Sequence, residues 1–212
     1  MSGKRQQRKT DRRVMRTREA LGDAIIEIMQ EKPFEKITVA ELLQRAQVSR
    51  STFYEHFRDK NDLFFSDADE FFSMMSNHLA RRQEASNRVA PVQEMLWHVK
   101  SMGQFLRALA ESGKIDEVME LGQAHMAKGI EGRLRAMPAG RRVPSESLAV
   151  KSQALAGAFR GLMMFWIRGG MRGSPAEMDQ LFHQLVWCGV ASDAKVGRGA
   201  PAQGARAKAP MV

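Results

Sequence analysis

The chain of 212 residues has one cysteine, Cys188, so no disulfide can form within it. A single thiol favours a reducing compartment, and we expect the protein to be cytoplasmic. No apolar run reaches the roughly 18 residues that a membrane-spanning helix needs. The nearest candidate, ALAGAFRGLMMFWI, is interrupted by Arg160. The opening residues, MSGKRQQRKTDRR, lack the apolar segment of a secretory signal.

The usual signs of catalysis are also missing. There is no Ser/His/Asp signature, no glycine-rich phosphate loop after a strand, and no residue spacing typical of metal ligands. Cys188 has no obvious base near it in the sequence, and His98 and His125 would bind metal only if the fold joined them to further ligands. We therefore expect no enzyme activity, no metal and no cofactor, against the rival interpretation of a small helical hydrolase.

Positive charge is abundant and unevenly distributed. Lysine and arginine number 33 against 24 acidic residues, which gives a formal net charge of +9. Through Arg18 there are eight basic residues, and Asp11 is the one acid. Such an excess favours a partner that carries phosphate, with nucleic acid first and an anionic membrane second. Solubility alone is the plain alternative.

Apolar residues recur at helical spacing along most of the chain, and the alternation of a strand is absent. With 43% hydrophobic residues, a packed core is feasible. We expect an all-α fold. The expected helices cover 13–30, a short segment after Thr38, a short segment after Ser49, and then 59–82, 91–112, 115–137, 147–168 and 174–190.

Several helix starts carry a recognisable capping pattern. Thr38 and Glu41 have the spacing of a capping box, in which the hydroxyl accepts a backbone N–H and the carboxylate reaches back to the cap. Ser49 is a favourable N-cap. Ser174 is followed by proline and by Glu177, which predicts a third helix start.

The segment QVSRSTFYEHFRDK combines an apolar face with a polar one. On a helix, Phe53 and Phe57 point to one side, while Arg50, Ser51 and Tyr54 point to the other. The two short helices and the connection between them have helix-turn-helix spacing, whose second helix enters the DNA major groove. Arg50 offers a guanidinium fork to guanine. The candidate DNA contacts are Thr38, Ser49, Arg50, Ser51, Thr52, Tyr54, His56, Lys60, Arg12 and Arg13.

The stretch ITVAELLQRAQVSRSTFYEHFRDKNDLF resembles the N-terminal domain of the TetR family of transcriptional repressors. The resemblance implies that Arg50 and Ser51 contact DNA bases. It implies that five residues contact the DNA backbone: Thr38, Lys60, Thr52, Tyr54 and His56. It further implies a homodimer on a palindromic operator, released by a small apolar or aromatic effector. Three positions depart from the family pattern: Gln47 replaces a common glycine, Ala40 a frequent arginine, and Asn61 a frequent acid.

The domain organisation follows from these observations together. We expect a flexible basic arm over 1–12, the helix-turn-helix domain over 13–60, a larger helical bundle for ligand binding and dimerisation over 61–191, and a disordered basic tail over 192–212. An architectural DNA-binding protein without an effector is the alternative function.

The two last helices are too apolar to face solvent, which predicts a four-helix dimer interface. Gly157 and Gly161 lie four residues apart and permit close helix approach. The expected interface residues are Gly157, Phe159, Gly161, Leu162, Leu181, Phe182 and Leu185. A monomer in which these residues fill the core is the alternative.

Methionine is frequent in the middle of the chain, and its adaptable side chain suits a pocket for varied apolar molecules. A methionine stripe that belongs to an ordinary core is the alternative interpretation. The candidate ligand-binding residues are Phe72, Met75, Trp97, His98, Met102, Phe105, His125 and Trp166.

Overall fold

The computed structural model describes residues 2–138 and 144–196, and the side chains of 13–103, 105–138 and 144–188 within them. This part of the chain is helical and contains no strand, as the sequence predicts. The elements are α1 (Ser2–Glu31), η1 (Phe34–Lys36), α2 (Val39–Ala46), α3 (Arg50–His56), α4 (Lys60–Ser76), α5 (His78–Arg81), α6 (Val92–Ser101), α7 (Gly103–Glu111), α8 (Ile115–Ala136), α9 (Ser145–Arg168) and α10 (Pro175–Val196).

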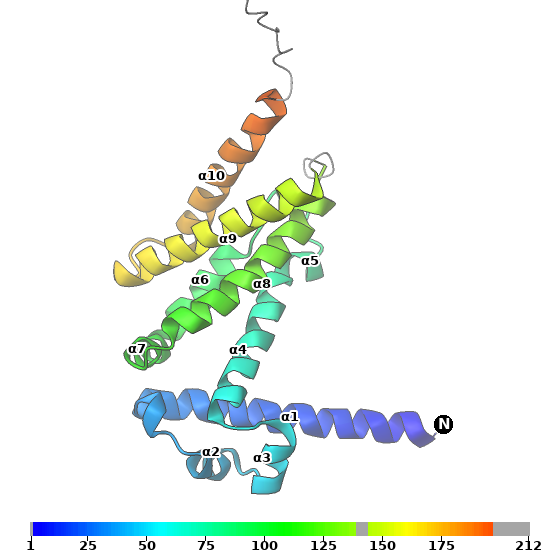
Figure 1. The fold of residues 1–212 in the computed structure, drawn as a ribbon, viewed down its shortest axis with the longest axis vertical. Coiled ribbons are helices and arrows are strands. Elements are labelled where there is room, and N and C mark those ends of the chain that lie inside the picture. Colours follow the sequence, from blue (N-terminus) through cyan, green and yellow to red (C-terminus); the bar gives the residue numbers. More distant parts are fainter. Residues whose placement is uncertain (1, 139–143, 197–212) are drawn as a thin grey trace, which may run out of the picture.

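The first three helices and η1 form a small unit, here called the head (Figure 1). Its core is built from the apolar face of α1, represented by Leu21 and Ile25, against Leu42 of α2 and the two phenylalanines of α3. Phe53 and Phe57 are buried, with ring centroids 5.7 Å apart. The pair fixes the orientation of α3 because its other face has nothing to pack against.

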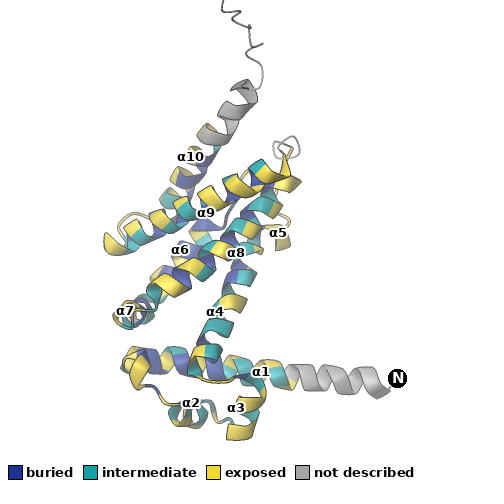
Figure 2. Cartoon of the chain, in the orientation of Figure 1, coloured by how far each residue is buried: buried dark blue, intermediate teal, exposed yellow. Residues whose placement is uncertain are grey.

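Helices α4 to α10 form the larger domain, and α4 rises into it from the head (Figure 1). Helix α8 packs along both α4 and α9, while α10 packs on α6. Buried residues concentrate where these helices face one another (Figure 2). Helices α4 and α8 approach closely, because a Cβ added to Gly129 would lie 2.4 Å from the Ser76 carbonyl oxygen and one added to Gly122 would lie 2.7 Å from the Phe72 ring.

Two helices that the sequence presents as continuous are each divided in the structure. Within the segment expected over 59–82, helix α4 ends at Ser76. Asn77 is the N-cap of the short α5, and its Nδ2 donates to the Ser73 carbonyl. The segment expected over 91–112 breaks at Met102 into α6 and α7. Its apolar residues therefore belong to two helices with different partners, since α6 packs on α10 and α7 on α1.

The ends of the chain also differ from expectation. Helix α1 begins at Ser2, so residues 2–12, expected as a flexible arm, continue the first helix. At the other end α10 extends to Val196, beyond the expected boundary at 191. The rest of the expected tail, 197–212, lies outside the described residues.

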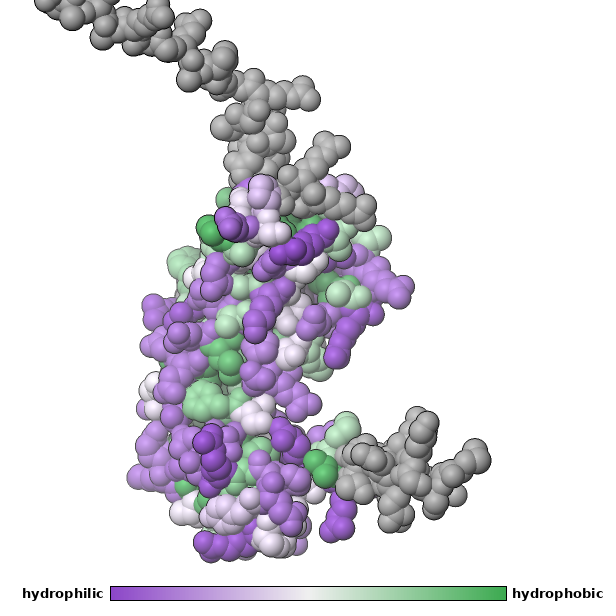
Figure 3. Space-filling view, turned by 45° about the vertical axis from the view of Figure 1, so that its right-hand side comes forward, coloured by the Kyte–Doolittle hydropathy of each residue, from purple (hydrophilic) through white to green (hydrophobic). Residues whose placement is uncertain are grey.

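The face drawn in Figure 3 is mostly hydrophilic, with small apolar patches between the charged side chains. Within the described part of the chain, every helix is too short or too polar to cross a lipid bilayer.

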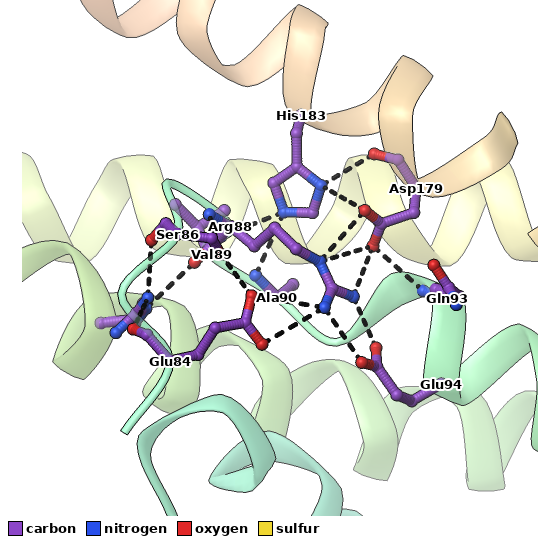
Figure 4. A network of polar contacts seen from close by, with 10 residues as sticks. Glu84, Ser86, Arg88, Val89, Ala90, Gln93, Glu94, Asp179 and His183 are labelled. Atoms are coloured by element: carbon purple, nitrogen blue, oxygen red, sulfur yellow. Dashed lines mark hydrogen bonds and ion pairs between the residues drawn. The ribbon is translucent and has the colours of Figure 1, made fainter. Parts of the chain in front are cut away.

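A partly buried polar network joins α10 to the segment before α6 (Figure 4). Arg88 donates to Asp179, with Nη2 and Oδ1 2.8 Å apart, and also binds Glu94. Val89 N–H donates to Nε2 of His183 over 3.0 Å, so this nitrogen is unprotonated and the ring is oriented by the backbone. The network adds polar contacts between α10 and the segment before α6 to the apolar packing of Phe182 and Val186.

Candidate functional site

The polar face of α3 is available to a partner. Arg50, Ser51 and Tyr54 are exposed, Tyr54 to 48%, opposite the buried phenylalanines. The Arg50 guanidinium lies 5.5 Å from the centre of the Tyr54 ring. Arg50 forms no ion pair with any described residue, so its charge is free for an external acceptor.

The start of α3 is arranged by Ser49. As expected, its hydroxyl caps the helix by accepting from Thr52 N–H at 3.2 Å. Ser49 Oγ also lies within hydrogen-bond distance of the Ser51 and Thr52 hydroxyls. These three hydroxyl groups form one connected cluster beside Arg50. His56, in the last turn, is half-buried.

The turn between α2 and α3 depends on a strained residue. Gln47 has φ 55° and ψ 38°, in the left-handed region that its family-typical glycine adopts without cost. Its Nε2 donates to the Gln44 carbonyl over 2.7 Å. The turn is therefore left-handed at this residue, with a glutamine where the family commonly has glycine.

The expected capping box at the start of α2 is confirmed. Glu41 N–H donates to Thr38 Oγ1, and Thr38 N–H donates to the Glu41 carboxylate. Lys32, together with Thr38, lowers the pKa of Glu41 to about 2. The box holds Thr38, which is exposed, at the start of α2.

Lys60 has a different role from the expected phosphate contact. Its Nζ donates to the carbonyls of Phe34, Glu35 and Ile37, at 2.8, 2.9 and 2.8 Å. Burial lowers its pKa. The start of α4 is likewise occupied, because Asp59 accepts the first free N–H groups. Lys60 therefore holds the start of α4 against η1. We correct its predicted role from a phosphate contact to this structural one.

Arg12, expected in the basic arm, and Arg13, the first residue of the expected helix-turn-helix domain, both lie on α1. Arg13 is exposed. The side chain of Arg12 lies outside the described residues.

A second candidate site is an apolar cavity of about 180 Å³ between α1, α4, α6, α7, α8 and α9. Its lining residues are Ile26, Phe64, Asp67, Ala68, Phe71, Phe72, Met95, His98, Val99, Met102, Phe105, Leu106, Leu109, Val118, Met119 and Met163. Four of the predicted ligand residues, Phe72, His98, Met102 and Phe105, are among them. His98 stacks on Phe71 with ring centroids 4.4 Å apart, and burial lowers its pKa.

The other four predicted ligand residues lie elsewhere. Met75 is buried outside the lining, and Trp97 is 67% exposed. His125 Nε2 lies 2.8 Å from the Asp69 carboxylate, and the Trp166 indole donates to the Gly173 carbonyl. His98 and His125 are thus occupied by different partners. No group of metal-ligating side chains occurs among the residues that the structure describes.

The sequence prediction missed Asp67, although a signal for it exists. Asp67 lies three residues after Phe64 and four before Phe71, both of which line the cavity. An acid in that register falls on the apolar stripe of α4 and not on its solvent face. Burial, followed by the nearby Glu70 and Asp23, raises the pKa of Asp67.

Comparisons with known proteins agree with this geometry. The family model described as bacterial regulatory proteins, tetR family, matches residues 21–66, which include α2, the turn and α3. An uncharacterized HTH-type transcriptional regulator, YxbF of Bacillus subtilis (strain 168), is 40% identical over 63 residues. That match covers 29% of this chain and 17% of the length of YxbF. Residues 21–66 belong to the TetR family.

Solved structures extend the likeness in fold to the larger domain. A TetR transcriptional regulator from Streptococcus agalactiae 2603V superposes with a TM-score of 0.56 at 21% identity, covering 84% of this chain and 97% of that one. The dihydroxyacetone kinase operon activator DhaS superposes at 0.53 with 16% identity, covering 85% and 97%. At these identities the likeness shows the shared fold.

The last two helices present apolar side chains to solvent. Phe165 of α9 is 75% exposed and Leu185 of α10 is 66% exposed, with Val150 and Leu181 also exposed. Of the predicted interface residues, Gly161, Leu181 and Leu185 are exposed, and Gly157 and Leu162 are half-buried. Phe159 and Phe182 are instead buried within the chain, with ring centroids 5.8 Å apart. They belong to the core and not to the exposed face of α9 and α10.

Proposed function

We propose that this chain is a dimeric transcriptional regulator, in the cytoplasm, that binds operator DNA through α3 and releases it when a small molecule occupies the cavity. The observation that supports it best is the exposed, unpaired Arg50 on a helix whose opposite face is fixed by buried phenylalanines. A recognition helix needs this combination, because its base-reading side must stay free while its orientation stays rigid.

In this proposal the N-terminal turn of α3 enters the major groove. The Arg50 guanidinium donates to guanine O6 and N7, a bidentate contact that distinguishes guanine from the other bases. Ser51, Thr52 and Tyr54 contact the backbone or a base edge, and Thr38 binds phosphate from α2. Arg13 adds salt-dependent affinity without sequence preference.

A symmetric dimer of this protein would bind a palindromic operator. The exposed apolar face of α9 and α10 pairs with the same face of a second copy, since an isologous contact needs a self-complementary surface. The two heads then present their α3 helices to half-sites about 34 Å apart, one turn of DNA.

The cavity supplies the regulation. It is lined both by α1 of the head and by α4, which joins the head to the larger domain. A ligand that prefers one arrangement of these helices shifts the population toward it and changes the separation of the heads. We propose that the protein represses transcription and releases DNA on ligand binding. Activation is the alternative, because the structural neighbour DhaS is described as an operon activator.

The test begins with DNA recovered by sequencing protein-protected genomic fragments. Arg50→Ala should relax the base preference at one position and cost about 1–3 kcal/mol on the preferred sequence. Arg58→Ala is the matched control, because Arg58 is an exposed arginine just outside α3 and is paired with Asp62. An unchanged sequence preference in Arg50→Ala would refute the base-reading role.

An architectural protein without an effector is the second candidate. Thermal unfolding separates the two, because a ligand that binds the folded state raises the melting temperature in proportion to its concentration above Kd. A library of small apolar and aromatic compounds that leaves the melting temperature unchanged would favour the architectural role.

A further inference from the structure

The cavity wall is apolar except at two residues, Asp67 and His98. Among the described lining residues, Asp67 is the side chain that carries a negative charge, and no lysine or arginine lines the cavity with it. His98 is the other titratable lining residue. It is stacked on Phe71, and burial lowers its pKa, which keeps the ring neutral at neutral pH.

The Asp67 carboxylate lacks a protein counter-ion. Within the described part of the chain, no group donates a hydrogen bond to it or forms an ion pair with it. Arg18, whose charge lowers the pKa of Asp67, donates instead to Ser66 Oγ at 2.6 Å and lies over the Phe57 ring. A half-buried carboxylate without a donor is costly, and a bound cation would compensate it.

We propose that the cavity binds a small lipophilic cation, one ring or short alkyl chain carrying a protonated amine, with the ammonium group paired to Asp67. The inference rests on the effector role proposed above and names the chemistry of that effector. The apolar wall contacts the hydrocarbon part of the ligand. The four phenylalanine rings of the lining also attract the ammonium group through cation–π interactions. The ammonium–carboxylate contact is a charge-assisted hydrogen bond.

Size and charge restrict the ligand further. The cavity of about 180 Å³ compares with the roughly 150 Å³ that suffices for benzene in an apolar cavity. A fatty carboxylate of similar size would meet Asp67 with like charge and find no lining cation among the described residues. The site therefore selects for charge as well as for shape.

The same carboxylate touches the head. A Cβ added to Gly22 of α1 would lie 2.7 Å from Asp67 Oδ1, and Ile26, one turn further along α1, lines the cavity. An ammonium group that draws the carboxylate into the cavity changes this contact between α1 and α4. The ligand thus acts directly on the helix from which the head is built.

Isothermal titration calorimetry of the full chain tests the inference with three probes of one skeleton: 2-phenylethylamine, 2-phenylethanol and phenylacetate. We expect the amine to bind about tenfold more tightly than the alcohol, and the acid most weakly. Asp67→Asn should bring the amine and the alcohol to within about twofold of each other. Glu70→Gln is the matched control: it removes the same charge one turn away, outside the lining, and should keep the preference.

Three results would overturn the inference: equal affinity of the wild-type chain for amine and alcohol, a preference that survives in Asp67→Asn, or no binding of the amine up to its solubility limit. All are measured without DNA. A failure of the Arg50→Ala test would leave the charge preference of the cavity standing, and a failure here would leave DNA recognition by α3 standing.

Discussion

Gly22 of α1 and Asp67 of α4 meet where the head joins the larger domain. A Cβ on Gly22 would lie 2.7 Å from Oδ1 of Asp67 and 3.0 Å from its Cγ. Any side chain at position 22 would therefore have to displace the carboxylate. The contact places an unpaired charge between the part proposed to read DNA and the part proposed to sense a ligand.

Replacing Asp67 by asparagine should stabilise the ligand-free protein at neutral pH. Burial raises the pKa of Asp67, with further contributions from Glu70 and Asp23 and an opposing one from Arg18. The folded state therefore holds this proton more tightly than the unfolded state, and stability falls as pH rises from about 4 through the raised pKa. Urea unfolding at several pH values should show the Asp67→Asn advantage growing over that range.

Glu120→Gln is the control for that experiment, since it removes an exposed carboxylate from α8. It should leave both the stability and its pH dependence close to wild type. If Asp67→Asn were less stable than wild type at every pH, the carboxylate would have a stabilising partner in the folded protein.

Lys60→Met should destabilise the protein by about 2 kcal/mol and leave the salt dependence of DNA binding unchanged. The substitution leaves the carbonyls of Phe34, Glu35 and Ile37 without their shared donor, and hydrogen bonds to charged groups contribute about 1.5–3 kcal/mol. Unfolding in urea measures the first effect, and fluorescence anisotropy across a salt series measures the second.

Arg13→Met gives the opposite pattern if the assignments are right. An exposed arginine that contacts phosphate should lower the salt slope by about one, with stability nearly unchanged. A reduced slope in Lys60→Met would restore Lys60 to the DNA interface and contradict its structural role.

Local signals in the sequence predicted local structure well. The caps at Thr38, Ser49 and Ser174 are all present, because each depends on residues within one helical turn. The exposed face of α3 follows from the spacing of Phe53 and Phe57 alone. Short-range hydrogen bonding and helical periodicity determine these features before any tertiary contact forms.

Features that depend on tertiary contacts were not predictable in the same way. The break at Met102 has no proline to mark it and becomes meaningful only because α6 and α7 pack on different helices. Lys60 looked like a phosphate ligand because its charge was visible and its three backbone acceptors, 23 to 26 residues earlier, were not. His125 and Trp166 were candidates by residue type and are occupied elsewhere.

Gln47→Gly should stabilise the protein by up to about 1 kcal/mol. The left-handed conformation costs a residue with a Cβ about 1–2 kcal/mol, and the greater freedom of glycine in the unfolded chain offsets part of the gain. Chemical denaturation at neutral pH measures the difference. Gln47→Ala is the control: it keeps the Cβ and loses the bond to the Gln44 carbonyl, so it should be no more stable than wild type.

Leu185→Glu should weaken the proposed dimer at least about a hundredfold. A symmetric interface loses the leucine twice, and each buried leucine contributes about 1.5 kcal/mol or more. Sedimentation equilibrium gives the dissociation constant. Met74→Glu places the same charge on an apolar residue of α4 that is 45% exposed, and it should leave the dimer intact. Equal behaviour of the two variants would remove α10 from the interface.

Asp179→Asn should destabilise the protein by about 3 kcal/mol at neutral pH, because it leaves Arg88 partly buried with one fewer carboxylate. Burial alone would raise the pKa of Asp179, but hydrogen bonds from His183 and Arg88 outweigh it and lower the pKa. The stabilisation is therefore present above about pH 4 and is lost as the pH falls through the lowered value. Unfolding in urea from pH 7 to pH 3 should show wild type losing its advantage over the variant in acid.

Asp116→Asn is the control, since it removes an exposed partner of Arg160, and it should change stability by less than about 0.5 kcal/mol at every pH. An Asp179→Asn variant as stable as this control would mean that apolar packing alone positions α10.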